Sequence, residues 1–293
     1  MGSKILAKES SIYKVNLFYM CVVIWSIIFQ FLPIPMKAYQ YITFLIPISI
    51  YLFIHKNQGD RILKPKILNV KSTIIIFIIW VFSLPIMVTM ADLYTSFFGN
   101  KLANIIIENH YEGFIENLIF TAITPAILEE ILMRGIILDG YRNKSFFVAA
   151  LINGIMFGML HLNFFQFFYT FIAGFIASYL VFATNSLYAA MIFHFINNGF
   201  PTILNYIYPS EPDTAYAVSP SLLNSLIQVM LSVIALSLFI HLLAKINGIN
   251  LIRHKQKSNE KIFNWPLITS IILFISFSIF LVILLSIKEK API

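Results

Sequence analysis

The chain has 293 residues, of which 59% are hydrophobic and only 11% are charged. Its mean hydropathy of +0.84 lies far above that of soluble domains and excludes an ordinary soluble globular protein. The formal net charge is +7, and the single cysteine, Cys21, excludes a disulfide framework within one chain.

Apolar runs long enough to cross about 30 Å of hydrocarbon recur along the whole chain. In chain order, they cover residues 15–33, 39–55, 72–90, 114–138, 147–162, 165–183, 187–206, 221–244 and 265–287. The sequence therefore predicts an all-α, polytopic transmembrane helical bundle with eight or nine spans. Residues 1–293 are expected to form a single membrane domain, because no soluble domain, repeat or low-complexity segment interrupts these runs.

The distribution of basic residues predicts the orientation of the spans. If the N-terminus is cytoplasmic and the spans alternate, most of the 20 basic residues lie on the cytoplasmic side, as the positive-inside rule requires. This topology explains the net charge without a nucleic-acid partner. Lys288 and Lys290 would follow the ninth span on the outside, so this span is the least secure. Between the third and fourth spans, apolar residues within 91–113 predict a short interfacial helix.

Three of the apolar runs contain ionisable or amide side chains. A charge at the centre of a membrane helix costs roughly 2.5–3.5 kcal/mol on insertion scales, so such residues usually face the protein interior and mark a functional site. The fourth, fifth and seventh runs carry Glu129, Glu130, Arg134, His161, His194 and Asn198. We therefore expect a polar site where these three helices meet.

Helical spacing in the fourth run separates its two carboxylates. Glu130 and Arg134 lie at i and i+4, so they can form an ion pair on one face. Glu129 is rotated by about 100° from Glu130 and is free to point elsewhere. Pro125 precedes Glu129 by one turn and lacks a backbone N–H, which predicts a local kink or widening of this helix.

The fifth run combines an imidazole with small residues. Phe157 lies one turn before His161 and can pack against its ring. Gly154 and Gly158 form a small-xxx-small face that permits close approach of a neighbouring helix. Asn153 is interpreted as a hydrogen-bond partner in helix packing.

The depths of the polar residues are consistent with one site. In the seventh run, His194 and Asn198 share a face at i and i+4. Counted from the expected cytoplasmic helix ends, Glu129 and His161 lie roughly 18 and 20 Å deep. By the same rise per residue, Asn198 and His194 lie roughly 16 and 10 Å deep. The four side chains can therefore converge on one slightly staggered layer.

Together and in this order, the three motifs resemble those of the CPBP family. This family comprises the CAAX prenyl endopeptidases of the Abi type and their bacteriocin-processing and immunity-associated relatives. The matching segments are Glu129-Glu130-Ile-Leu-Met-Arg134, Phe157-Gly-Met-Leu-His161 and His194-Phe-Ile-Asn-Asn198. The resemblance covers about residues 113–206, which are the expected catalytic core, and the motifs show no departure from the family pattern.

The resemblance implies an intramembrane endopeptidase. Glu129 matches the catalytic glutamate, and His161 matches the histidine that helps it to activate water. His194 and Asn198 match the pair that stabilises the oxyanion. The supporting residues of the first two motifs are Glu130, Arg134 and Phe157.

The chemistry of peptide hydrolysis agrees with this assignment, because it needs a base, a proton donor for the leaving amine and donors for the oxyanion. A direct glutamate mechanism without a cofactor is favoured. Zinc is the alternative, since Glu129, His161 and His194 can supply two imidazoles and a carboxylate with an open fourth position. Against zinc, the sequence has no His-Glu-x-x-His helix, and Asn198 is a poor zinc ligand.

Two other functions remain open. Glutamates and histidines on membrane helices also form proton relays, as in a proton-coupled transporter. A catalytically silent immunity or regulatory protein can keep the same residues for stability or binding.

The expected partners are membrane lipid and a peptide or membrane-anchored protein substrate, and the oligomeric state is open. The Lys-, Ile- and Asn-rich composition indicates an AT-rich genome and a bacterial plasma membrane. A bacterial source favours a pheromone, a bacteriocin leader or a membrane-anchored protein over a prenylated CAAX tail.

Overall fold

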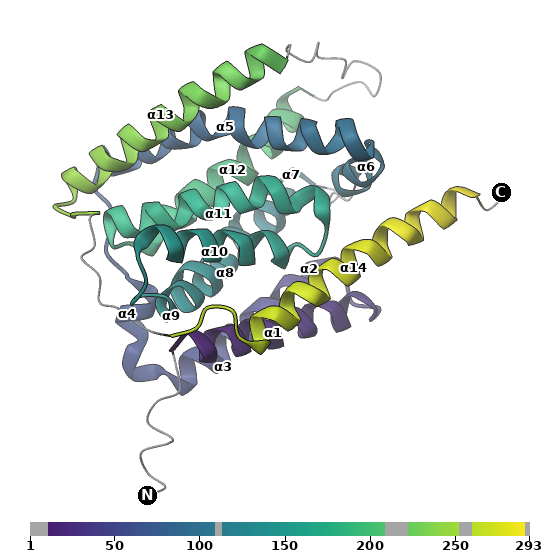
Figure 1. Ribbon diagram of the computed structural model, residues 1–293, viewed down its shortest axis with the longest axis horizontal. Coiled ribbons are helices and arrows are strands. Elements are labelled where there is room, and N and C mark those ends of the chain that lie inside the picture. The colour runs from purple at the N-terminus through teal and green to yellow at the C-terminus, as the bar shows by residue number, and fades with distance from the viewer. Residues whose placement is uncertain (1–10, 109–112, 209–221, 252–259, 291–293) are drawn as a thin grey trace, which may run out of the picture.

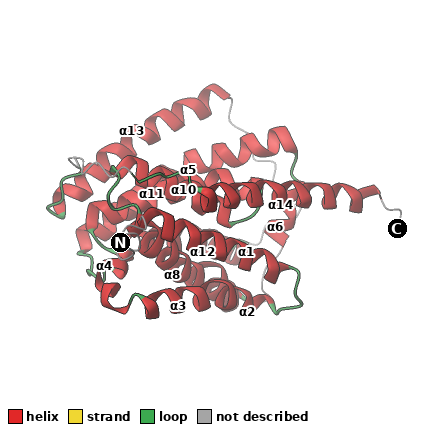
Figure 2. Cartoon of the chain, turned by 60° about the horizontal axis from the view of Figure 1, so that its bottom comes forward, coloured by secondary structure: helices red, strands yellow, loops and turns green. Residues whose placement is uncertain are grey.

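The computed structural model describes residues 11–108, 113–208, 222–251 and 260–290. Within these ranges, every regular element is a helix (Figure 2). The predicted all-α class is therefore confirmed for the described residues. Segments 1–10 and 252–259, whose basic residues enter the orientation argument, lie outside them.

The elements follow the apolar runs of the sequence. The first are α1 (Ser11–Gln30), α2 (Met36–Gln40), η2 (Tyr41–Leu45), α3 (Ile46–Ile54), η3 (Lys56–Gln58), α4 (Gly59–Leu63), α5 (Val70–Phe98) and α6 (Lys101–Glu108). They continue with α7 (Phe114–Asn117), η4 (Leu118–Ile123), α8 (Thr124–Glu130), η5 (Ile131–Ile137), α9 (Leu138–Gly140), α10 (Phe146–Leu160), α11 (Phe164–Thr184), α12 (Leu187–Ile207), α13 (Leu222–Ile246) and α14 (Trp265–Lys290). The segments η2, η4 and η5 are π-helical, and η3 is a 3₁₀ turn. A helix, α6, is present where the short interfacial helix was expected.

Six helical stretches among the described residues are long and apolar enough to cross a membrane. They are Ser11–Gln30, Met36–Ile54, Val70–Phe98, Phe164–Thr184, Leu222–Ile246 and Trp265–Ile287. The other three predicted runs correspond to residues 114–140, α10 and α12, which are segmented, shorter or more polar. The span count of eight or nine and the cytoplasmic N-terminus stay predictions.

The helices lie in three layers (Figure 1). On one side α5 packs along α13, and on the other side α1 packs along α14. The middle layer contains α8, α10, α11 and α12, which carry the three motifs. Both views show the C-terminal part of α14 extending beyond the other helices (Figures 1 and 2).

Contacts between helix ends fall into two groups. In one group, Ser11 Oγ donates to Gly140 O at 2.9 Å, and the Leu187 N–H donates to Lys64 O at 3.2 Å. In the other group, Lys37 Nζ lies 2.6 Å from a carboxylate oxygen of Glu116. Ends that the alternating topology assigns to the same side of the membrane therefore meet in space.

Residues 114–140 form one continuous but irregular helix, the segmented helix, made of α7, η4, α8, η5 and α9. Its first π-helical turn, η4, ends two residues before Pro125. Because Pro125 has no N–H to donate to Thr121 O, a regular α-helix cannot continue through this turn. The widening predicted at Pro125 is therefore confirmed. A second π-helical turn, η5, follows Glu130 and contains Arg134.

The helices α10 and α11 form a tight hairpin. The sequence predicted that His161 lies inside a helix. Since α10 ends at Leu160, His161 instead lies at the C-cap of this helix. Leu162 has a φ of 57°, in the left-handed region that reverses the chain. Asn163 then caps α11, because its Oδ1 accepts the Gln166 N–H at 2.8 Å. The hairpin turn therefore presents His161 to the middle layer.

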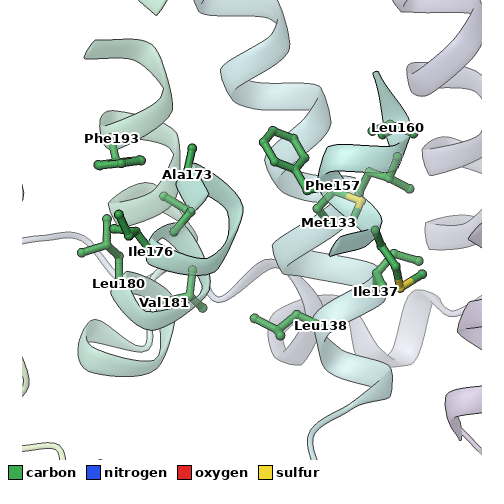
Figure 3. Packing of buried hydrophobic residues seen from close by; sticks show 14 of the residues in the cluster. Met133, Ile137, Leu138, Phe157, Leu160, Ala173, Ile176, Leu180, Val181 and Phe193 are labelled. Atoms are coloured by element: carbon green, nitrogen blue, oxygen red, sulfur yellow. The ribbon is translucent and has the colours of Figure 1, made fainter. Parts of the chain in front are cut away.

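Apolar packing surrounds these segments. One hydrophobic cluster contains residues from all three layers. Figure 3 shows the part formed by the segmented helix, α10, α11 and α12, with Met133, Ile137, Leu138, Phe157, Leu160, Ala173, Ile176, Leu180, Val181 and Phe193. Polar side chains in the middle layer are therefore enclosed by close-packed hydrocarbon.

Candidate active site

Glu130 accepts two hydrogen bonds inside the middle layer. Its Oε1 lies 2.8 Å from Arg134 Nη1 and 2.8 Å from His194 Nδ1. Glu130 and Arg134 are only 1% and 0% exposed, so the ion pair predicted from their spacing is present and fully buried. The second bond ties the segmented helix to α12.

The hydrogen bonds of His194 define its tautomer. Because the Glu130 carboxylate accepts, Nδ1 of His194 carries a hydrogen. On the other side of the ring, Nε2 lies 3.1 Å from the amide nitrogen of Asn198, which donates to it. In this arrangement Nδ1 is the donor and Nε2 the acceptor, and His194 and Asn198 lie on one helix face as expected.

Asn198 directs both of its amide hydrogens at protein acceptors. Its Nδ2 donates to Thr121 O at 3.0 Å as well as to His194 Nε2. Thr121 O is the carbonyl that Pro125 leaves without its usual helical donor. Asn198 therefore braces the segmented helix, and an oxyanion role would require it to exchange one of these two bonds.

Glu129 is the carboxylate that stays outside this network. It is 8% exposed, and its Oε2 is buried without a hydrogen-bond partner among the described residues. It lies close enough to His194, Glu130 and Arg134 to interact with them electrostatically. The two adjacent carboxylates are thus separated as the helical spacing predicts.

Phe157 packs where the three motifs meet. The centroid of its ring lies 4.2 Å from the guanidinium carbon of Arg134, within cation–π range. The ring also makes edge-to-face contacts with His161 and His194, at centroid separations of 5.1 and 5.8 Å. The expected contact with His161 is confirmed, whereas the contacts with Arg134 and His194 were not evident from the spacing.

His161 has one ring nitrogen engaged. Its Nδ1 lies 3.0 Å from Phe157 O, and because a carbonyl accepts, Nδ1 carries the hydrogen and Nε2 remains an acceptor. His161 also interacts electrostatically with His194 and Arg134. The described residues therefore bring all four expected catalytic side chains into one connected region.

Glycines bring α10 and α11 together beside Arg134. A Cβ on Gly154 would lie 2.9 Å from a backbone oxygen of α11, and one on Gly158 would lie 2.8 Å from another. The predicted close approach is therefore confirmed, with α11 as the partner. Gly174 of α11 was missed in the sequence analysis, although Ser178 one turn later gives it the same small-xxx-small spacing. A Cβ on Gly174 would lie 3.1 Å from Arg134 Nη2.

Two further polar residues were not assigned to the site. Asn153 Nδ2 donates to Met133 O at 2.8 Å, inside the second π-helical turn. Gln40 Nε2 donates to Phe120 O at 3.0 Å, inside the first. The hydrogen bond that Asn153 makes between helices confirms its interpretation as a hydrogen-bond partner in helix packing. No local signal distinguished Gln40 from other polar residues near helix ends.

The alternative zinc ligands do not fit a metal site in this arrangement. Among the described residues, no group of three or more His, Cys, Asp or Glu side chains is placed to hold a metal ion. Both ring nitrogens of His194 are engaged, one by Glu130 and the other by Asn198. A zinc ion bound by His194 would therefore have to displace one of these partners.

Comparison with known families gives one match. Residues 112–200 match the family described as Type II CAAX prenyl endopeptidase Rce1-like. No curated protein and no solved structure matches the chain. The matched segment contains all three motifs, and with the six apolar helices it identifies an integral, multi-pass membrane protein.

Proposed function

Because residues 112–200 match the family described as Type II CAAX prenyl endopeptidase Rce1-like, we propose that this chain is a membrane-embedded endopeptidase with Glu129 as its base. It hydrolyses a peptide bond in a membrane-associated peptide or protein, with water as the nucleophile. The family match supports the reaction class, and the contacts of the side chains suggest their individual roles.

The contrast between Glu129 and Glu130 carries this proposal. Arg134 and His194 both bind Glu130 Oε1 at 2.8 Å, so the charge of Glu130 is already compensated. Each of the two carboxylates has one buried oxygen, Oε2, without a hydrogen-bond partner, but among the described residues Glu129 forms no ion pair with Arg134 or His194. A carboxylate that is not held by a cation is available to accept a proton from water.

The reaction begins when Glu129 takes a proton from water as the oxygen attacks the scissile carbonyl. His161 Nε2, which remains an acceptor, orients this water. Glu129 then gives the proton to the leaving amine. General acid–base groups of this kind typically contribute about 10²–10⁴-fold to the rate.

Asn198 stabilises the tetrahedral intermediate in this scheme. One of its amide hydrogens turns from His194 Nε2 to the developing oxyanion, while the other remains on Thr121 O. His194 stays fixed by Glu130 and Phe157 during this exchange. A single donor of this kind is typically worth about 10²–10³-fold in rate.

Purified protein in liposomes tests the proposed reaction. Two quenched fluorescent peptides of one Cys-a-a-X sequence are supplied without an ion gradient, one farnesylated on cysteine and the other unmodified. We expect new peptide ends by mass spectrometry with the wild type and none with Glu129→Gln. Cleavage of both peptides would favour a pheromone- or leader-like substrate, and cleavage of the farnesylated peptide alone would favour a prenylated one.

The same preparation separates the endopeptidase from a proton-coupled carrier. A carrier would take up peptide only when a proton gradient is imposed and would leave the peptide intact. The native substrate is then sought by comparing the peptides in membranes that carry the wild type with those in membranes that carry Glu129→Ala. If neither the two probes nor any membrane peptide is cleaved by folded wild-type protein, the proposed function is wrong.

A further inference from the structure

We propose that Gln40 and Asn153 are positioning residues of the active site, acting through the backbone of the segmented helix. Together with Asn198 they form the amide clamp, in which three carboxamides bind carbonyls on both sides of Glu129 and Glu130. The effect of the clamp on catalysis rests on the proposed function, whereas its effect on the backbone does not.

The first half of the clamp replaces hydrogen bonds that the helix cannot make. Thr124 N donates to Ile119 O, five residues earlier, and Pro125 has no N–H. Neither residue therefore donates to Phe120 O, which instead accepts Gln40 Nε2 at 3.0 Å. Asn198 Nδ2 supplies the bond that Pro125 cannot make to Thr121 O, at 3.0 Å.

The second half of the clamp lies one turn after the carboxylates. Met133 O accepts the Leu138 N–H across the π-helical turn and also accepts Asn153 Nδ2 at 2.8 Å. Ser178 of α11 orients this amide, because its hydroxyl donates to Asn153 Oδ1 at 3.0 Å. Asn153 and Ser178 are fully buried, so an unmade bond here would leave polar groups in hydrocarbon.

The clamp matters because the two π-helical turns set how the residues between them, including Glu129 and Glu130, are rotated about the helix axis. A π-helical turn holds about one more residue than an α-helical turn. It occurs mostly as a single turn within an α-helix, frequently at functional sites. If η4 relaxed to α-helix, the residues after it would rotate by about 100°. Glu129 would then lose its place beside His194, and Glu130 would lose its bond to His194, whereas Arg134 follows η4 on the same helix and would rotate with Glu130. The bonds from α2, α10 and α12 stabilise the π-helical form.

Three variants remove the clamp with little change in side-chain volume. Gln40→Met and Asn153→Leu delete the donors. Ser178→Ala removes the hydroxyl that orients Asn153 and that also lies 2.9 Å from Gly174 O. We expect kcat on a cleaved peptide to fall by about 10²-fold in the first two, the cost of misplacing reacting groups by about 1 Å. KM should change by less than about twofold, because neither Gln40 nor Asn153 is proposed to contact the substrate. The control is Asn247→Ala, since Asn247 binds Ser72 and Leu243 outside the segmented helix.

Hydrogen exchange measures the clamp independently of activity. Amides within 118–137 should exchange on the order of tenfold faster in Gln40→Met and Asn153→Leu, the change expected for one lost hydrogen bond. Amides of α13 should not change. If Asn153→Leu fails to fold, hydrogen exchange is measured on Ser178→Ala instead. A smaller increase in the exchange rate is then expected in the same segment. Unchanged exchange in 118–137 for both Gln40→Met and Ser178→Ala would overturn the clamp, whether or not the wild type cleaves a peptide.

Restoring a backbone donor gives the last test. Pro125→Ala supplies an N–H to the turn that Gln40 and Asn198 brace. The loss of kcat caused by Gln40→Met should therefore shrink by at least about twofold in the Pro125→Ala background. The alternative outcome is that the kcat losses of Gln40→Met and Pro125→Ala multiply in the double variant while KM rises in the single variants. This outcome would assign Gln40 to substrate binding and overturn its positioning role.

Discussion

Glu129 and Glu130 are neighbours in the chain, yet one helical step of about 100° gives them different surroundings. Glu130 shares its Oε1 between Arg134 and His194. Glu129 forms no ion pair in the described part of the chain, although each carboxylate has one buried oxygen without a hydrogen-bond partner. This difference is the basis for proposing a structural role for Glu130 and a catalytic role for Glu129.

Replacing Glu129 by glutamine keeps its shape and removes the base. We expect Glu129→Gln to lower peptide cleavage by at least about 10²-fold, the lower range for general-base catalysis. The measurement is the rate of fluorescent peptide cleavage by folded protein in liposomes. Glu116→Gln is the control, because Glu116 forms an exposed pair with Lys37 and should keep full activity. Normal turnover by folded Glu129→Gln would refute the assignment.

Arg134 is predicted to act through stability. Arg134→Ala would leave Glu130 buried without its cation, at a cost of about 3–5 kcal/mol. Thermal unfolding in detergent should therefore show less folded protein along with lost activity. Arg61→Ala is the comparison, since Arg61 pairs with Asp139 while its side chain is 46% exposed, and such pairs contribute about 1 kcal/mol or less. An Arg134→Ala protein as stable as the parent but inactive would make the role of Arg134 catalytic.

At the scale of elements, the α10–α11 hairpin forms one wall of the site. Gly154 and Gly158 allow α11 to approach α10, and Gly174 leaves room for the Arg134 guanidinium. The hairpin turn also places His161 at the end of α10, where its ring contacts Phe157. Close helix packing and the position of the charge pair therefore depend on the same crossing.

A methyl group at this crossing tests that dependence. In Gly174→Ala, the added Cβ would lie 3.0 Å from Gly154 Cα and 3.1 Å from Arg134 Nη2. We expect the free energy of unfolding to fall by about 1–3 kcal/mol, as for other overpacked cores. Gly59→Ala is the matched control, because its Cβ would meet nothing within 4 Å. If the two variants have equal thermal stability, α10 and α11 can move apart at this crossing without a loss of stability, and the prediction is wrong.

At the scale of the whole molecule, the ends of the helices meet in two groups that the alternating topology assigns to opposite sides. The polar chemistry lies between these groups, in the middle layer (Figure 1). Six helices are long and apolar enough to span a membrane, and the site helices pack among them. The orientation of the bundle decides which side of the membrane supplies the substrate.

Cysteine labelling measures this orientation. Cys21 is the single cysteine of the chain, so Cys21→Ser gives a background without thiols. In intact cells, a membrane-impermeant maleimide should label Lys37→Cys, which is predicted to lie outside. It should label Lys56→Cys only after permeabilisation, because the positive-inside rule places that loop in the cytoplasm. The reverse pattern would invert the topology.

Metal removal tests the choice between the two hydrolytic mechanisms. A zinc enzyme would hold about one ion per chain and lose activity when it is stripped. We expect strong chelation to leave cleavage intact, since both ring nitrogens of His194 are engaged by Glu130 and Asn198. Metal content is measured on the same sample. Loss of cleavage on chelation, restored by zinc, would replace the direct glutamate mechanism.

Local spacing predicted much of the fold and part of the site. The nine apolar runs coincide with helices, and the widening at Pro125 follows from its missing N–H. The pairs Glu130–Arg134 and His194–Asn198 follow from i,i+4 geometry on one helix. The roles of the site residues in catalysis stay predictions.

The sequence by itself determined an all-helical chain with three polar motifs, because apolar length and helical period are properties of neighbouring residues. Only the tertiary structure decided how the motifs meet. The bond between Glu130 and His194 joins residues 64 positions apart, and the bond between Gln40 and Phe120 joins residues 80 positions apart. Such contacts depend on how each helix is rotated and crossed against its neighbours. That rotation is set by the glycines at the α10–α11 crossing and by the π-helical turns, so it is a property of packing and not of spacing along one helix.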